Sequence, residues 1–249
     1  AKCGAWEEAR KLFEKLHVRD VVSWTAVIAA YVQQGMANDA LECFYRMKDE
    51  GVNPDVVTYI CILKACGILR STHIGEHIDT EVRRLGLFQN NAMLGNALAN
   101  TYATCGDIGN AQEVFEKLPI QDVVSWNALI TGYNQQEQCQ QAIMCFEQMQ
   151  RDGFSPNVVT YTCILKACSK TGSISMGEKI REVVSRKGLL EEDIMLGNTL
   201  VDMYAKCGLL GKALEVLEEL LVRNVVSWNA LIAGHVQYGQ GHEALTCYE

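Results

Sequence analysis

The chain has 249 residues, of which 49% are hydrophobic and only three are proline, so it can bury a large interior and is neither disordered nor fibrous. A net charge of −8 argues against a duplex-DNA binder, which usually presents a basic face, but leaves single-strand binding open. No stretch approaches the roughly 18 uninterrupted apolar residues of a membrane span. The start carries neither a targeting segment nor an initiator Met, so we expect a soluble piece of a longer protein with no membrane partner.

One sequence phrase returns along the chain. VVSWTAVI at Val21–Ile28 is followed by VVSWNALI at Val123–Ile130 and Val225–Ile232, each start 102 residues after the last. ILKAC and YAxCG mark two further kinds of segment inside this unit, and the opening AKCG at Ala1–Gly4 echoes the second of them. Cutting at these echoes predicts the modules 1–20 (incomplete), 21–55, 56–91, 92–122, 123–157, 158–193, 194–224 and 225–249 (incomplete).

Each module has the pattern of two helices, as module 21–55 illustrates. Gly35 can end the first helix by adopting a left-handed backbone, and Asn38 is then expected to cap the second. Gly51 and Pro54 close the module. The expected apolar positions are Ala26, Ile28, Ala29, Tyr31 and Val32 in the first helix and Ala40, Leu41, Phe44 and Met47 in the second.

A helix pair this short cannot cover its own apolar faces, so it must stack on its neighbours. We therefore predict an all-α protein, a right-handed α-solenoid whose first helices line a concave inner surface. The incomplete modules at both ends leave a helix face uncovered, and we expect end-to-end self-association there.

The eleven cysteines follow the repeat, which indicates small buried core residues rather than disulfides. The matching sets are Cys43 with Cys145 and Cys247, Cys61 with Cys163, Cys66 with Cys168, and Cys105 with Cys207. His73 and His77 lie one helical turn apart, but no third ligand of a suitable type is near. We expect no metal and no cofactor.

The alternation of VVSWNALI…ALxCF…NPD, VVTYxCILKAC and MLGNxL…YAxCG modules resembles the plant pentatricopeptide repeat (PPR) proteins of the P-L-S subclass, over essentially the whole chain. The resemblance makes 21–55, 123–157 and 225–249 P modules, 56–91 and 158–193 long (L) modules, and the others S modules. It implies a helix-turn-helix solenoid that reads single-stranded RNA at one base per module.

In this family the fifth and last residues of a module select the base, and the second residue wedges between bases. The implied selecting pairs are Thr25 with Asp55, Asn96 with Asp122, Asn127 with Asn157, Thr162 with Asp193, and Asn198 with Asn224, while Asp20 and Asn229 belong to half pairs. The implied wedge residues are Val22, Val57, Met93, Val124, Val159, Met195 and Val226. Thr with Asp favours G, Asn with Asp favours U, and Asn with Asn favours C before U. Ile60, at the fifth position of module 56–91, offers no hydrogen bond and should read nothing.

Several residues have a second interpretation. Trp24, Trp126 and Trp228 either stack on RNA or pack in the core, and core packing is the stronger expectation, as for the Tyr31, Tyr102, Tyr133 and Tyr204 set. The fifth-position asparagines are alternatively polar residues favoured at a helix N-terminus. Lys64 and Lys166 either meet phosphate or are ordinary solvated lysines.

Two functions follow from the resemblance. The first is a sequence-specific RNA-binding module of a mitochondrial or chloroplast RNA-processing factor that specifies C-to-U editing sites. The second is a scaffold that binds partner editing factors through its long modules. We expect no enzyme activity here, because the H-x-E and C-x-x-C elements of the zinc deaminase-like domain found in many family members are not in this sequence.

Overall fold

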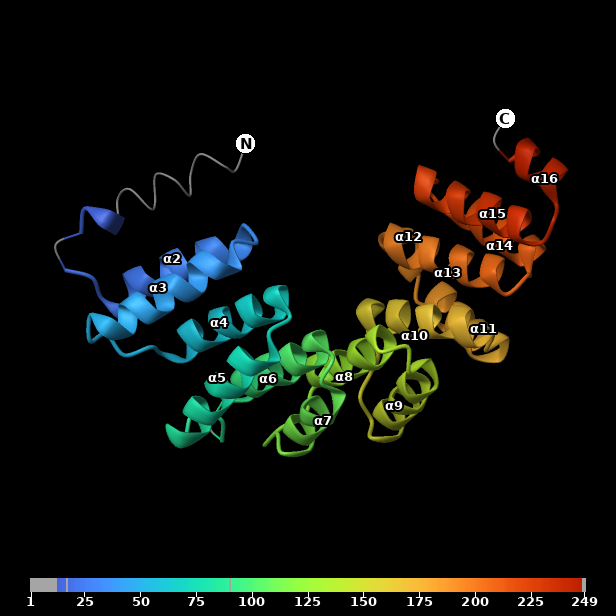
Figure 1. Cartoon of the computed structure of the whole chain (residues 1–249). Helices are drawn as coiled ribbons and strands as arrows, with labels where there is room; N and C mark the ends of the chain where they lie inside the picture. The colour runs from blue at the N-terminus through green and yellow to red at the C-terminus, as the bar shows by residue number, and fades with distance from the viewer. Residues whose placement is uncertain (1–12, 17, 90, 248–249) are drawn as a thin grey trace. The chain divides into compact units, whose positions relative to one another are not determined.

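The computed structural model describes residues 13–16, 18–89 and 91–247, and every regular element in these ranges is a helix (Figure 1). AKCG at Ala1–Gly4, with most of module 1–20, lies outside the described residues. None of the described helices is both long and apolar enough to cross a membrane. The chain divides into two compact units, one up to Gly132 and one from Tyr133 onward.

The first unit contains α2 (Val21–Gln33), α3 (Ala37–Asp49), α4 (Val56–Leu69), α5 (Thr72–Arg84), α6 (Ala92–Cys105), α7 (Ile108–Glu116) and the start of α8 (Val123–Gln135). The second contains the end of α8, α9 (Cys139–Arg151), α10 (Val158–Thr171), α11 (Ile174–Arg186), α12 (Leu189–Glu192), α13 (Ile194–Lys206), α14 (Leu210–Glu219), α15 (Val225–Gln237) and α16 (Gly241–Thr246). From residue 21 on, the first residue of every predicted module is also the first residue of a helix.

The helix starts are set by the last residue of the preceding module. In each case its Oδ1 atom accepts a hydrogen bond from the backbone N–H of the third helical residue, at 2.8 to 3.1 Å. Such a bond satisfies one of the amides left unpaired at a helix start and contributes about 0.5–2 kcal/mol. The seven residues are Asp20, Asp55, Asn91, Asp122, Asn157, Asp193 and Asn224.

Within each unit the first helices of successive modules pack directly on one another. In the first unit α2 contacts α4 and α4 contacts α6, and in the second α10 contacts α13 and α13 contacts α15 (Figure 1). The second helices pack beside this row, as α3 does against α2 and α4, α5 against α4 and α6, and α14 against α13 and α15. The row of first helices is therefore the surface that positions the predicted site residues.

Two glycines permit close helix packing in this row. A Cβ atom added at Gly132 of α8 would lie 2.6 Å from Ile108 and 2.7 Å from Ala103, and one at Gly234 of α15 would lie 2.9 Å from Ala205. No real Cβ fits at such distances, so these positions require glycine.

Most of the pattern predicted for module 21–55 is confirmed. Gly35 has a φ of +75°, and the apolar positions expected in the second helix are all buried. The predicted cap is wrong, because α3 begins at Ala37 and Asn38 is exposed within its first turn. Ala26, expected on the apolar face of the first helix, is also exposed.

The prediction that the cysteines are buried is correct for only part of the set. Cys43, Cys66 and Cys168 are buried, whereas Cys61, Cys105, Cys145, Cys163, Cys207 and Cys247 are half-buried at the edges of the core. None of the ten described cysteines forms a disulfide. Burial raises the pKa of Cys66 and of Cys168 to about 12, so both remain protonated near neutral pH.

Candidate nucleic-acid interface

The predicted wedge residues stand out from the row of first helices. Each is the second residue of its helix, and each is apolar yet between 54% and 70% exposed. The first turn of a helix does not require an exposed apolar side chain, yet one occurs at the same place in all seven modules. The wedge residues are Val22, Val57, Met93, Val124, Val159, Met195 and Val226.

The predicted base-selecting residues are recessed beside them. The fifth residue lies three positions after the wedge, so both share one helix face. The exposed fraction is only 8% or 9% at Thr25, Asn96, Asn127 and Thr162. Asn198 is half-buried, whereas Asn229 is exposed. These asparagines do not cap their helices, because the caps are the last residues of the preceding modules.

Asn96 and Asp122 form a direct pair within the first unit. The Asn96 Nδ2 donates to Asp122 Oδ2 at 2.9 Å and to Oδ1 at 3.1 Å, and Oδ1 also accepts the Ser125 N–H at 2.9 Å. The carboxylate holds the Asn96 amide with its nitrogen turned toward Asp122. Asn96 Oδ1 is consequently a buried acceptor without a hydrogen-bond partner in the described chain, a state that costs about 1–3 kcal/mol. A donor on a bound molecule would remove that cost.

Asn198 and Asn224 form the equivalent pair in the second unit. Asn198 Nδ2 donates to Asn224 Oδ1 at a longer 3.3 Å, and Asn198 Oδ1 is again buried without a partner among the described residues. Both asparagines line a groove of about 670 Å³ together with the wedge residues Met195 and Val226 and with Lys166 of α10. One groove thus combines a polar pair, an apolar residue from each of two successive modules, and a cation.

Thr25 and Asp55 are connected only through a third residue, Thr58. The Thr58 hydroxyl lies 2.6 Å from Thr25 Oγ1 and donates to Asp55 Oδ1 at 2.8 Å. Thr58 was not predicted as part of the site. The signal that identifies it is its place as third residue after an Asp cap, where a hydroxyl completes a capping box.

The remaining predicted site residues are placed as follows. The Thr162 hydroxyl donates to the Val158 carbonyl of its own helix at 2.8 Å, and Asp193 caps α13. Asn127 and Asn157 belong to different units. Asp20, which belongs to a half pair, caps α2, and the hydrogen bond from the Ser23 N–H lowers the pKa of its carboxyl. Ile60, which is expected to read no base, is half-buried.

Most of the aromatic residues proposed as alternative RNA-stacking groups are core residues. Trp24 is fully buried and Trp126 is 4% exposed, and their rings meet Phe13 and Phe115 edge-on at centroid distances of 4.7 and 4.6 Å. Trp228 is half-buried. Of the tyrosine set, Tyr31, Tyr102 and Tyr204 are buried and Tyr133 is half-buried.

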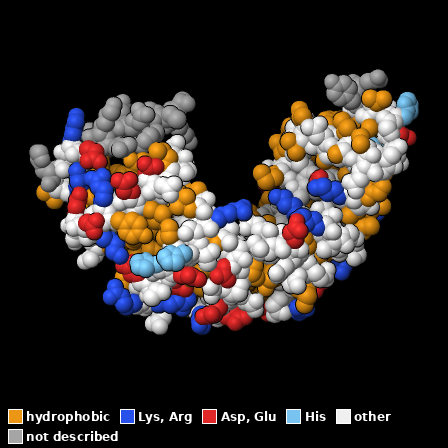
Figure 2. All heavy atoms as spheres, in the orientation of Figure 1, with side chains coloured by type: hydrophobic (Ala, Val, Ile, Leu, Met, Phe, Trp, Pro, Cys, Tyr) orange, Lys and Arg blue, Asp and Glu red, His pale blue; other side chains and the backbone are white. Residues whose placement is uncertain are grey.

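Charged side chains of both signs are interspersed over the face seen in Figure 2. Many pair with each other, as Lys206 does with Asp202 at 2.7 Å and Lys170 with Glu137 at 3.3 Å. Lys166 lies on the same helix as Lys170, but it makes no salt bridge within the described chain. His73 and His77 are exposed, and the described residues contain no group of three potential metal ligands.

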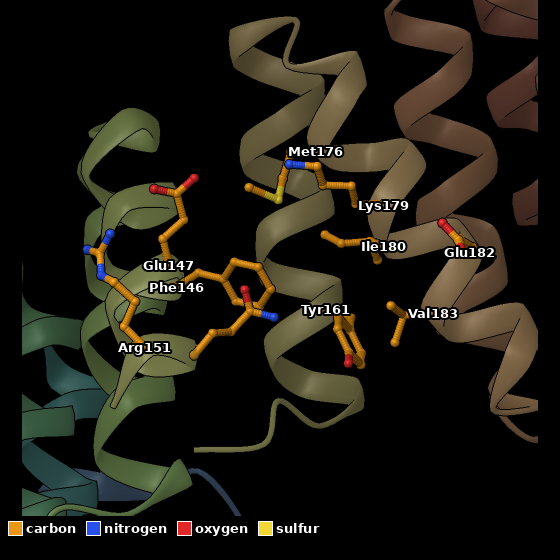
Figure 3. Close-up of a pocket in the computed structure, with 10 residues that line it drawn as sticks. Phe146, Glu147, Arg151, Tyr161, Met176, Lys179, Ile180, Glu182 and Val183 are labelled. Atoms are coloured by element: carbon orange, nitrogen blue, oxygen red, sulfur yellow. The ribbon is translucent and has the colours of Figure 1, made fainter. Parts of the chain in front are cut away.

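A second groove, of about 610 Å³, lies in the second unit between α9, α10 and α11 (Figure 3). Figure 3 shows Phe146 extending from α9 toward Tyr161, and the two ring centroids are 6.4 Å apart. At the equivalent place in the first unit Lys48 and Glu81 form a salt bridge of 2.7 Å. The corresponding lining residues 102 positions later are Gln150 and Val183, which cannot form it.

Comparison with known proteins identifies the repeats themselves. A model of the PPR repeat family matches residues 19–67 and 121–170, and a second model, of the PPR repeat, matches 159–189, 198–225 and 226–249. Together these matches cover more than half of the chain. The chain belongs to the PPR repeat family.

Similar PPR proteins occur in Arabidopsis thaliana. A mitochondrial pentatricopeptide repeat-containing protein is 38% identical over all of this chain, and a chloroplastic one is 33% identical over 98% of it. In both cases the matched region is 39% of the relative, so this PPR chain spans well under half of their length.

Solved structures show the same fold. The crystal structure of the PPR protein PPR10 in complex with an 18-nucleotide psaJ RNA element matches the whole chain with a TM-score of 0.82 at 22% identity, and the match covers 38% of that protein. A crystal structure of PPR10 from maize matches 99% of the chain and 41% of that protein, with a TM-score of 0.62 at 19% identity. The predicted all-helical repeat fold is confirmed.

Proposed function

We propose that this PPR chain binds single-stranded RNA in a sequence-specific manner, at one base per module. The observation that carries the proposal is the groove in which the Asn198–Asn224 pair lies beside Met195 and Val226. Exposed apolar side chains suit the faces of unstacked bases, and recessed amides suit their edges. The RNA held by PPR10 in a structure of the same fold supports the choice of RNA.

The helix caps suggest how a module distinguishes bases. Because Oδ1 of the last residue always accepts from the next helix, the atom that differs between Asp and Asn is the second one, an acceptor oxygen or a donor nitrogen. At Asn96 and Asp122 the partnerless Asn96 Oδ1 and the carboxylate present acceptors. This edge suits the N3–H of uracil and repels the N3 lone pair of cytosine.

At the Asn198–Asn224 pair, the Asn224 Nδ2 adds a donor. This donor suits the N3 acceptor of cytosine, as the family's preference of C before U implies.

The order of bases follows from the modules. With the 5′ end toward the N-terminus, as in the family, modules 21–55 to 194–224 prefer G, any base, U, C or U, G weakly, and C or U. The fifth position is weak because long modules of this family follow the rule poorly.

We further propose that the whole protein works in a mitochondrion or chloroplast, the locations that the names of its matched relatives give. The alternation of module types supports membership of the P-L-S subclass and a role in specifying sites of C-to-U editing. This chain contributes recognition and no catalytic group of its own.

The direct test is binding of the purified chain to a matched RNA as a single strand and as a duplex. We expect binding to the single strand, because in a duplex the base edges are paired and cannot reach the recessed asparagines. A duplex of arbitrary sequence serves as the control. Equal binding to that duplex and to the matched single strand would contradict the proposal.

Lys166 provides a test of how the strand is held. Replacing Lys166 by glutamine should weaken binding to every RNA sequence alike, because a lysine without a salt bridge in the groove is placed to meet a backbone phosphate. The slope of log K against log salt should become shallower by about 0.7, the contribution of one phosphate on a single strand.

Lys170→Gln is the matched control for this test. Lys170 lies on the same helix and is paired with Glu137, so its loss should leave the slope unchanged. An unchanged slope for Lys166→Gln as well would identify Lys166 as an ordinary solvated lysine.

The groove between α9, α10 and α11 supports the second function, a scaffold for a protein partner. Its apolar floor of Phe146, Tyr161, Ile180 and Val183 is open where the first unit carries the Lys48–Glu81 salt bridge. A partner bound there would be unaffected by substitution of Asn96, whereas RNA binding would be weakened. The two functions use different residues, although α10 contributes to both grooves, and they are compatible.

A further inference from the structure

The Thr25, Thr58 and Asp55 side chains form a hydrogen-bonded chain that the family's two-residue rule does not include. Thr58 is fully buried at the start of α4, and its hydroxyl is in contact with three groups. These are Thr25 Oγ1 at 2.6 Å, Asp55 Oδ1 at 2.8 Å and the backbone N–H of Asp55 at 3.3 Å. A hydroxyl has one proton to donate and two lone pairs to accept with, so the three contacts use its whole capacity.

The direction of the protons in this chain follows from the charges. The carboxylate of Asp55 can only accept, so the single proton of Thr58 belongs to that bond, which is also the stronger one because it is charge-assisted. The contact with Thr25 then requires Thr25 to donate. With its proton directed inward to Thr58, Thr25 Oγ1 can only accept from any other molecule.

We propose that Thr58 is a positioning residue: it orients the Thr25 hydroxyl so that module 21–55 presents only hydrogen-bond acceptors to the base and thereby selects guanine. The first acceptor is Thr25 Oγ1. The second is Asp55 Oδ2, which has no hydrogen bond within the described chain, because the cap uses Oδ1 alone. Guanine carries two adjacent donors, N1–H and the N2 amino group, on its Watson–Crick edge. Adenine has an unprotonated N1 there, which would face a lone pair.

The inference rests on the proposed RNA binding and adds a residue from the following module to the reading of a base. It also separates Thr25 from Thr162, the other threonine at a fifth position. The Thr162 hydroxyl donates to the carbonyl of Val158 rather than to a neighbouring hydroxyl. Of these two threonines, Thr25 is the one linked to the last residue of its own pair, through the Thr58 hydroxyl.

The first experiment uses the unaltered chain and changes the hydrogen-bonding groups of one base of the RNA. Competition binding is measured with RNAs that carry guanine, inosine or adenine at the first base of the site. Inosine keeps the N1–H of guanine and lacks its amino group, so we expect guanine to bind best, then inosine, and adenine about tenfold or more below guanine. Adenine binding as well as inosine would overturn the proposal.

The second experiment removes the Thr58 hydroxyl. In Thr58→Val, Thr25 is free to rotate its proton outward and donate to adenine N1, so the preference for guanine over adenine should fall about tenfold. Thr58→Ser restores a hydroxyl and should restore the preference. The control is Thr160→Val, which removes the equivalent capping hydroxyl in the second unit, 3.0 Å from Asn157 Oδ1. It should leave the first base unaffected.

The outcomes distinguish this proposal from the one on which it rests. An unchanged guanine-to-adenine ratio in a folded Thr58→Val chain, with the third base still read as uracil, would overturn the role of Thr58 and leave RNA recognition standing. A chain that binds no single-stranded RNA would overturn both. If Thr58→Val fails to fold, the comparison of guanine, inosine and adenine on the unaltered chain still tests whether module 21–55 presents only acceptors to the first base.

Discussion

Replacing Asp122 by serine is expected to shift the third base of the site from uracil toward cytosine. In the structure the carboxylate holds Asn96 Nδ2 at 2.9 and 3.1 Å and so leaves Asn96 Oδ1 as the only free end of the amide. Serine removes the second acceptor and the charge. The Asn96 amide can then turn its nitrogen toward the N3 acceptor of cytosine.

The expected change in discrimination is about 1–3 kcal/mol, the usual value of a specific contact to a base edge. Stability should change little, because serine also caps a helix and can replace Oδ1 as acceptor for Ser125 N–H. The measurement is competition binding with RNAs that differ only at the third base. Asp193→Ser, at another aspartate cap, is the control and should leave this base unaffected. An unchanged preference in the folded Asp122→Ser chain would show that this module does not read the base as assigned.

Replacing Trp126 by alanine is expected to lower the free energy of unfolding by about 3–5 kcal/mol, the usual cost of deleting a buried large aromatic side chain. Trp126 is 4% exposed, and its ring packs edge-on against Phe115. Denaturant unfolding of the two proteins gives the difference directly.

Val124, two residues earlier on α8, provides the matched variant for Trp126→Ala. It is 60% exposed, so Val124→Ala should cost little stability but should weaken RNA binding by about 1 kcal/mol, in proportion to the apolar surface lost. The opposite result, a stable Trp126→Ala chain that no longer binds RNA, would make Trp126 a stacking residue rather than a core residue.

The fold was predictable because the sequence repeats its own boundaries. VVSW and VVTY each follow an Asp or Asn, and the structure begins a helix after each of these residues. The alternation of Gly, apolar and polar positions then determines which faces are buried, as at Phe44 and Met47. The second helix of module 21–55 does not begin as predicted, because Met36 continues the turn after Gly35 and α3 forms without a side-chain cap.

The candidate site was predictable in position but not in its bonding. The resemblance placed Asn96 opposite Asp122, and the structure pairs them directly. Spacing alone could not show that Asp122 and its equivalents also cap the next helix, which gives a structural reason for an Asp or Asn at every module end. Nor could it show that Thr58 stands between Thr25 and Asp55, because that contact depends on how two helices pack.

Selection of bound sequences from a random single-stranded RNA pool is the most direct measurement of base reading by this chain. The expected consensus has G at the first position, U at the third, pyrimidines at the fourth and sixth, and no preference at the second. Recovery of RNA with no consensus, or of RNAs sharing only a hairpin duplex, would contradict one-base-per-module recognition.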